Sequence, residues 1–287
     1  LSKNDSDNFK QFLASFYRRR IIRILPPLVF LLILGTILTV LFVPNSWLSE
    51  TISKTVISAF FGFSNIILPL VDDGYFSSRA DFNPFIHTWS LGVEEQFYLL
   101  FPIIYYFSVH HTGKLSNYKN IIIWLIPLLL TVSIFYSYYE VNHDQTKAYY
   151  LIFSRFWELA AGALLFHLHS LNKFKPKSIF QAYFFLLSGL ILIISGFIYS
   201  DKTSFPFPWA FLPVLGSAFL INSFVYEKEK ISLITYLFQS KIMIFIGKIS
   251  YSLYLWHWLV FSLFRWTVGF STLLQITVAV LFSILFS

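Results

Sequence analysis

Long apolar windows recur along the whole chain, and they restrict it to one class of fold. Each window is close to the length that crosses a bilayer as an α-helix, about 20 residues. Only 12% of the residues are charged and 56% are hydrophobic, so a soluble domain would lack polar surface. The sequence therefore predicts an all-α, polytopic transmembrane helical bundle, with windows at 22–43, 55–70, 89–109, 120–139, 148–169, 179–200, 206–226, 242–264 and 267–287.

The window at 55–70 is short and carries Gly62, Asn65 and Pro69 inside it. The asymmetry of Lys and Arg between the two sides of a membrane sets the orientation of its helices. If this window does not cross, fourteen loop Lys and Arg residues lie on one side and five on the other; if it crosses, they divide ten against nine. We therefore expect eight crossings, a re-entrant or interfacial segment near 55–70, and a cytoplasmic start of the chain.

The absence of Cys, the spacing of the His residues and the net charge exclude several classes of site. The chain contains no Cys, which excludes disulfides, thiolate metal sites and a cysteine nucleophile. The seven His residues show no spacing typical of a metal site, so we expect no metal. The net charge of +7 is explained by the orientation signal of a membrane protein, and we expect no nucleic-acid partner.

Ionisable residues within the apolar windows are the first functional candidates, because each is costly in lipid unless it is paired or hydrated. In "NPFIHTWSLGVEEQFYLLFP", Glu94 and Glu95 lie near the expected outer end of a helix, and His87 precedes them by about two turns. In "RFWELAAGALL", Arg155 and Glu158 are spaced i,i+3, which also suits a salt bridge that only neutralises both charges.

A third polar stripe lies in "GKISYSLYLWHW", where Ser250, Tyr254 and His257 follow at i, i+4 and i+7. A single His on such a helix is more often structural than catalytic, although the aligned Tyr and Ser favour a functional role. The expected orientation places this stripe and the carboxylates of the previous segments in the outer half of the membrane. Their convergence predicts a polar site inside the bundle.

A dense basic patch precedes the first apolar window in "FYRRRIIRILPP". One interpretation is an orientation signal that also contacts anionic lipid. The other is a clamp for a phosphorylated cytosolic ligand, because the Arg fork binds phosphate oxygens in a bidentate manner. The sequence leaves both interpretations open for Arg18, Arg19, Arg20 and Arg23.

Five stretches resemble acyltransferase family 3, the O-antigen acetylase type of integral membrane acyltransferase. They are "SFYRRRIIRILPP", "FFGFSNI", "NPFIHTWSLGVEEQFYLLFP", "RFWELAAGALL" and "GKISYSLYLWHW", in the family's order and spacing. The resemblance implies a single membrane acyltransferase domain over 1–287, located in the cell inner (plasma) membrane. It implies transfer of an acyl group, usually acetyl, from cytoplasmic acyl-CoA to a hydroxyl of a surface or periplasmic glycan such as lipopolysaccharide, with no bound cofactor.

By the same resemblance, the four arginines would hold the CoA phosphates. The family's WSL-x-x-E pattern falls on Glu94, which makes Glu94 rather than Glu95 the expected functional carboxylate. Arg155 and Glu158 would shape the acceptor or thioester site. The expected catalytic residues are Glu94, Arg155, Glu158, Tyr254, His257 and His87.

Members of this family also carry an Arg followed by a His in their first span, and that His is the leading candidate for the catalytic base. This chain begins at Leu1, after that motif. We therefore expect the first two transmembrane helices and further C-terminal sequence to lie outside it, and the fragment to be inactive alone. The alternative function is a polytopic transporter of a lipid-linked sugar or acyl group, because broken helices and buried Arg–Glu pairs suit transport as well.

Overall fold

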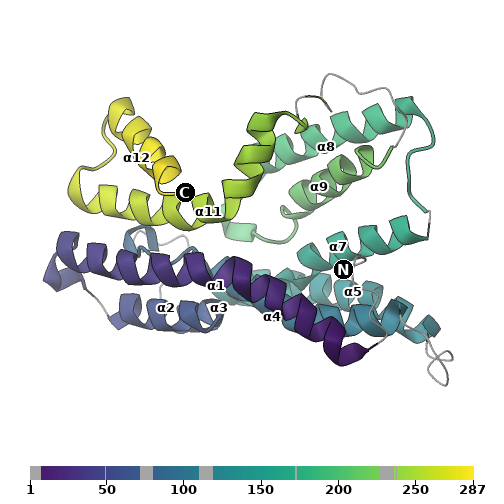
Figure 1. Ribbon diagram of the computed structural model, residues 1–287, viewed down its shortest axis with the longest axis horizontal. Coiled ribbons are helices and arrows are strands. Elements are labelled where there is room, and N and C mark those ends of the chain that lie inside the picture. Colours follow the sequence, from purple (N-terminus) through teal and green to yellow (C-terminus); the bar gives the residue numbers. More distant parts are fainter. Residues whose placement is uncertain are drawn as a thin grey trace. The chain divides into compact units, whose positions relative to one another are not determined.

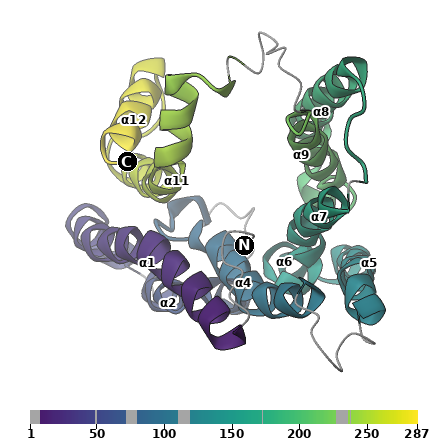
Figure 2. The ribbon, with the colours of Figure 1, turned by 45° about the vertical axis from the view of Figure 1, so that its right-hand side comes forward.

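The computed structural model describes residues 8–48, 50–71, 80–109, 119–171, 173–226, 236 and 238–287. Within these ranges the regular structure is entirely helical, as the sequence predicts. The chain divides into two compact units, the first formed by Leu1–Lys119 with Ile246–Ser287 and the second by Asn120–Phe245. The helices of each unit can be followed in Figures 1 and 2.

The elements of the first unit are α1 (Phe9–Phe42), η1 (Asn45–Trp47), α2 (Glu50–Phe60), α3 (Ser64–Val71), η2 (Ala80–Phe82), α4 (Thr88–Val109), most of α11 (Lys241–Thr267) and α12 (Leu273–Leu285). The unit is built around the long helix α1, which packs on the short helix α2 and on the longer helices α4 and α11. Its apolar core joins α1, α2, α4 and α11. A Cβ on Gly35 would lie 2.9 Å from the buried Phe85 ring and 3.0 Å from Leu259, so glycine permits the close contact of α1 with this core.

The helix α1 begins 13 residues before the predicted window, so the arginine patch lies inside it. The Asn8 side chain accepts a hydrogen bond from Lys10 N at 3.1 Å and caps the first turn, and arginine is a good helix former. At about 1.5 Å per residue, its 34 residues extend roughly 51 Å, well beyond the ~30 Å hydrocarbon core of a bilayer.

The doubtful window at 55–70 is a broken segment. The helices α2 and α3, of 11 and 8 residues, are each too short to cross a core of ~30 Å. Between them Gly62 adopts φ +73°, a left-handed conformation that favours glycine. Asn65 of α3 and Gln96 of α4 exchange two amide hydrogen bonds of 3.2 and 2.8 Å, which fix α3 against α4. A re-entrant or interfacial position for this segment stays a prediction.

The second unit contains a closely packed helix pair, α8 with α9, visible side by side in Figures 1 and 2. A Cβ on either Gly189 or Gly216 would lie 2.8 Å from the carbonyl oxygen of the other, so small residues permit this contact. The elements of this unit are α5 (Lys119–His143), α6 (Gln145–Tyr150), α7 (Ile152–Ser170), α8 (Ile179–Tyr199), η4 (Lys202–Ser204) and α9 (Phe211–Ser223).

Among the described residues, four helical segments are long and apolar enough to cross a membrane: Phe9–Phe42, Trp124–His143, Gln145–His169 and Ile179–Tyr199. The helices α9 and α12 are apolar but have only 13 residues each. Both begin later than predicted, because Pro206 and Pro208 precede α9 and cannot continue a helix, while Gly269 (φ +78°) ends α11 before the Thr272 cap of α12. The total of eight crossings stays a prediction.

Candidate functional site

The helix α11 is attached to the turn segment before α4 by a row of polar side chains. Turns leave backbone carbonyls without helical partners, and these need donors when they are buried. Trp258 Nε1 donates to Asn83 O at 2.9 Å, Ser262 Oγ to Phe82 O at 3.2 Å, and Trp266 Nε1 to the same Phe82 oxygen at 3.1 Å. The spacing of four residues places these donors on one face of α11.

His87 lies at the centre of an aromatic cluster formed with α11. Its side chain is only 4% exposed, and its ring centroid lies 5.4 Å from that of Tyr254 and 5.9 Å from that of His257. The Trp258 ring also belongs to this cluster, with its centroid 6.3 Å from that of His87. The structure therefore brings together three of the predicted catalytic residues, His87, Tyr254 and His257, which come from two distant parts of the sequence.

The Tyr254 hydroxyl fixes the backbone at His87. It donates its single proton to the His87 carbonyl oxygen. The Ser90 hydroxyl lies 2.7 Å from the same Tyr254 oxygen, and because that proton is already used, Ser90 acts as the donor. In this arrangement Tyr254 positions the segment that carries His87, and it has no second proton to offer an oxyanion.

The ring of His257 has a defined tautomer. Its Nδ1 lies 3.2 Å from the Leu253 carbonyl oxygen, and a carbonyl can only accept. Nδ1 is therefore protonated, and in the neutral ring Nε2 carries the lone pair. A general base takes up its proton through such a lone pair.

A second polar cluster joins α1 to α4. The guanidinium carbon of Arg20 lies over the Tyr98 ring, 3.9 Å from its centroid, and the positive charge of Arg20 acts on both Glu94 and Glu95. The Tyr98 hydroxyl hydrogen-bonds the Glu94 carboxylate one turn earlier on α4. Glu94 is thus held between a cation and a phenol.

The position of Arg20 corrects one expectation from the sequence. The arginines were expected at the cytoplasmic end and Glu94 in the outer half of the membrane, but Arg20 and Glu94 lie at the same level of the α1–α4 pair. The error arises because α1 extends to Phe9, so the patch lies inside a helix that runs antiparallel to α4. Arg18, Arg19 and Arg23 are exposed, whereas Arg20 is half-buried.

The two adjacent carboxylates differ in their surroundings. Glu95 Oε1 is buried and accepts no hydrogen bond from the described residues. Glu95 also lines a cavity of about 230 Å³ between α1, α4 and the α2–α3 junction, together with Arg20 and Gln96. Glu94 is not part of that lining.

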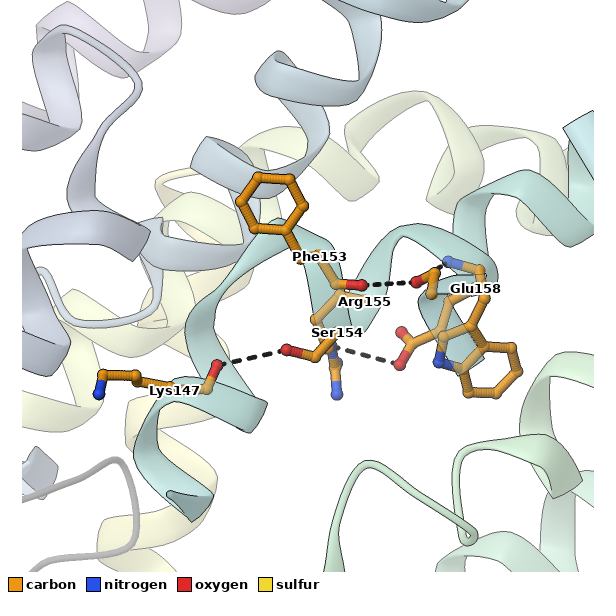
Figure 3. Close-up of polar contacts among 7 residues, drawn as sticks. Lys147, Phe153, Ser154, Arg155 and Glu158 are labelled. Carbon is orange, nitrogen blue, oxygen red and sulfur yellow. Dashed lines mark hydrogen bonds and ion pairs between the residues drawn. The ribbon is translucent and has the colours of Figure 1, made fainter. Parts of the chain in front are cut away.

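Arg155 and Glu158 belong to α7 of the second unit, where they pair with each other. Arg155 Nε lies 3.3 Å from Glu158 Oε1, and the Arg155 guanidinium stacks over Tyr149 and Phe205 at 5.4 and 5.1 Å. Figure 3 shows this ion pair beside the start of α7. The i,i+3 spacing thus forms the ion pair that the sequence allowed as one alternative. The predicted catalytic role of Arg155 and Glu158 stays a prediction.

The start of α7 is fixed by hydrogen bonds that the sequence did not reveal. Ser133 Oγ of α5 donates to Phe153 O at 2.7 Å and accepts from Trp157 N at 3.0 Å, and Ser154 Oγ donates to Lys147 O at 3.4 Å (Figure 3). These contacts set the first turns of α7 and thereby the place of Arg155.

Sequence reasoning also missed several residues of the first unit: Asn83, Gln96, Tyr251, Trp258 and Ser262. The recurrence of polar residues at 254, 258 and 262 was the signal that could have identified part of the α11 row. Among the residues that the structure describes, no three His, Asp or Glu gather as a metal ion would need.

Comparisons with known proteins place the chain in a family. The acyltransferase domain family called acyltransferase 3 matches residues 7–287. A Staphylococcus aureus (strain COL) protein, named only provisionally as an O-acetyltransferase, is 32% identical over 257 residues, covering 87% of this chain and 41% of its own length. The O-acetyltransferase OatA of S. aureus (strain NCTC 8325 / PS 47) is 30% identical over 253 residues, covering 86% of this chain and 40% of its own length.

A Haemophilus influenzae protein described as uncharacterized is 34% identical over 216 residues, which are 74% of this chain and 86% of that protein. No solved structure matches the chain. The chain spans about two fifths of the length of the O-acetyltransferase relatives. Since the family match covers nearly all of the sequence, the chain belongs to the acyltransferase 3 family.

Proposed function

We propose that the full-length protein is an integral membrane O-acyltransferase of the cell inner (plasma) membrane. It moves an acyl group, most simply acetyl, from cytoplasmic acyl-CoA to a hydroxyl of a cell-surface or periplasmic glycan. The observation that carries this proposal is the family match over residues 7–287, together with relatives whose names are O-acetyltransferase. Four helices long and apolar enough to cross a membrane support the membrane location.

The transfer needs three physical contributions. The C–S bond of the donor thioester breaks and a C–O bond to the acceptor forms, so a base must take the hydroxyl proton. A cation or hydrogen-bond donor must stabilise the oxyanion that develops on the carbonyl oxygen. The donor must also be held by its phosphates, for which Arg side chains are suited.

The first unit carries groups suited to act as the base and to hold the phosphates of the donor. On this chain the candidate base is His257, whose neutral ring carries a lone pair on Nε2. Arg18, Arg19 and Arg23 are exposed and suited to phosphate. Arg20 lies between that patch and Glu94, which holds the guanidinium through charge and through Tyr98. Tyr254 positions His87 beside His257.

For the second unit, we assign the Arg155 guanidinium the oxyanion-stabilising role. Glu158 orients it by an ion pair of 3.3 Å, and the rings of Tyr149 and Phe205 restrict its movement. Preorganised donors of this kind are effective because they need not reorganise during the reaction.

Labelled acetyl-CoA tests the proposal. Membranes that contain the full-length protein are incubated with acetyl-CoA labelled in the acetyl group, and the glycan fraction is isolated and treated with mild base. The proposal predicts base-labile label in the glycan. Absence of label, with glycan still crossing the membrane in a protein-dependent manner, would support a transporter instead.

A further inference from the structure

The cavity that Glu95 lines has both buried and exposed lining residues. Leu28, Ala59 and Leu91 are 4, 2 and 4% exposed and belong to the apolar core of the first unit. Phe61 and Leu99 are 63 and 56% exposed. Because a ligand enters where the lining is exposed, we expect its tip to end against the three core residues, which we call the closed end.

The cavity has few polar groups, and they differ in whether they already have a hydrogen-bond partner. The Gln96 amide is occupied by Asn65 and the Gly62 carbonyl oxygen. Glu95 Oε1 is buried and accepts no hydrogen bond from the residues that the structure describes. The remaining charged group is Arg20, which lines the cavity from α1. A buried acceptor of this kind is costly until a donor reaches it.

The size of the cavity limits what it can hold. About 230 Å³ is smaller than the roughly 300–1,000 Å³ typical of sites that enclose a whole drug-sized ligand. The cavity therefore suits the end of a longer molecule. That molecule needs an apolar tip for the leucine-lined end, an N–H donor for Glu95, and an anionic part that remains near the arginines.

These three requirements distinguish two molecules available to a membrane protein. The arm of acyl-CoA has phosphates at one end, two amide N–H groups along its length, and a thioester with its acyl group at the tip. A phospholipid also combines phosphate with apolar chains, but its hydrocarbon tails offer no N–H to a carboxylate. The buried oxygen of Glu95 favours the amide-bearing arm.

We infer that this cavity binds the thioester end of the acyl donor, with Glu95 accepting a hydrogen bond from an amide of the arm and Leu28, Ala59 and Leu91 limiting the length of the acyl chain. This inference rests on the proposed acyltransferase function. It gives the adjacent carboxylates different tasks, since Glu95 binds the donor arm while Glu94 holds Arg20.

Acyl-chain selectivity tests the closed end. Leu28→Ala should raise the ratio of kcat/KM for butyryl-CoA over acetyl-CoA about tenfold, because one or two methylenes in an apolar pocket are worth that much. Leu32→Ala is the matched control, since Leu32 is 5% exposed in the same core but does not line the cavity. An unchanged ratio in Leu28→Ala, or an equal change in both variants, would overturn the inference.

Cysteine protection tests occupancy without requiring transfer, because the chain has no native Cys. In the detergent-solubilised full-length protein, Leu99→Cys should react with N-ethylmaleimide about tenfold more slowly when acetyl-CoA is present. Leu100→Cys, 55% exposed and next in sequence but outside the lining, should show no such protection. Protection of Leu99→Cys by phosphatidylglycerol but not by acetyl-CoA, or protection at neither site, contradicts the inference.

Glycan acylation tests the proposed function, and protection of Leu99→Cys tests the cavity as the donor site, so either can fail without the other. Glycan acylation without protection of Leu99→Cys leaves the proposed function intact and removes this cavity as the donor site. Protection by acetyl-CoA without glycan acylation supports the cavity and contradicts the proposed function.

Discussion

Arg20 of α1 lies over the ring of Tyr98 of α4, with its guanidinium carbon 3.9 Å from the ring centroid. The Tyr98 hydroxyl bonds Glu94, so the three side chains connect the arginine patch to the carboxylate on which the family pattern falls. Arg20 of the arginine patch and Glu94 are therefore separated by about the length of a side chain, and not by the thickness of a bilayer.

Replacing Arg20 by Lys should weaken donor binding although the charge is kept. Lys has neither the planar fork nor the ring-stacking geometry that Arg20 uses over Tyr98. We expect KM for acetyl-CoA to rise about tenfold in Arg20→Lys, as measured by initial-rate kinetics. Arg18→Lys is the control, because Arg18 is exposed and should change KM by less. An equal rise in KM in both variants would contradict a special role for Arg20 and would mean that the arginines of the patch contribute to donor binding only through their charge.

Replacing Glu94 by Gln should abolish acylation while the amount of protein in the membrane stays normal. The amide keeps the size of the side chain but removes the negative charge that faces Arg20. We expect a loss on the order of 100-fold in acetyl transfer, the range for removal of a group that acts in proton transfer or its positioning. Glu95→Gln should retain part of the activity. Full activity in both variants would remove the carboxylates from the mechanism.

A methyl group at Gly92 should separate α3 from α4. A Cβ there would lie 2.6 Å from Asn65 Oδ1 and 3.1 Å from the Gly62 carbonyl oxygen, so the Asn65–Gln96 amide pair cannot persist unchanged. We expect Gly92→Ala to destabilise the protein by about 1–3 kcal/mol, measured as a lower thermal midpoint in detergent. Gly162→Ala, where the added Cβ would meet no described atom within 4 Å beyond its own helix backbone and chain neighbours, should be neutral or slightly stabilising.

The cap of α6 should respond to acid. The backbone N–H of Lys147 stabilises the Asp144 carboxylate and lowers its pKa below the ordinary value of 3.8. Because the folded-state pKa is depressed, the stabilisation is present above that value and is lost as the pH falls through the folded pKa. Asp144→Ala should therefore cost about 1 kcal/mol at neutral pH. The measurement is the difference in thermal midpoint between the wild-type protein and Asp144→Ala, which should shrink below about pH 4. A difference that does not change with pH would contradict the capping role of Asp144.

The sequence predicted those helices whose ends carry clear signals. The predicted windows at 89–109 and 179–200 agree closely with α4 (Thr88–Val109) and α8 (Ile179–Tyr199), because each is a continuous apolar run with a defined boundary. The prediction of helix ends from the sequence failed where polar helix formers continue a helix beyond its apolar part, as at the start of α1. Hydropathy cannot show such an extension, since arginine favours the helix but not the lipid.

The site was predictable by residue type but not by position. Periodicity identified Tyr254 and His257, the family pattern favoured Glu94 over Glu95, and the structure pairs Tyr254 and His257 with His87. The packing of Arg20 on Tyr98 depends on the register between α1 and α4, which no local pattern encodes. The hydrogen bonds from α11 to the carbonyl oxygens of Phe82 and Asn83 likewise depend on tertiary packing.

Vectorial acetyl transfer tests the central claim most directly. The full-length protein is reconstituted into sealed vesicles of known orientation with glycan inside, and labelled acetyl-CoA is added outside. Where the arginine-bearing start of the chain faces outward, label should appear in the enclosed glycan, and Glu94→Gln should abolish it. Label that appears equally in vesicles of the opposite orientation, or no label with glycan present, would contradict the account.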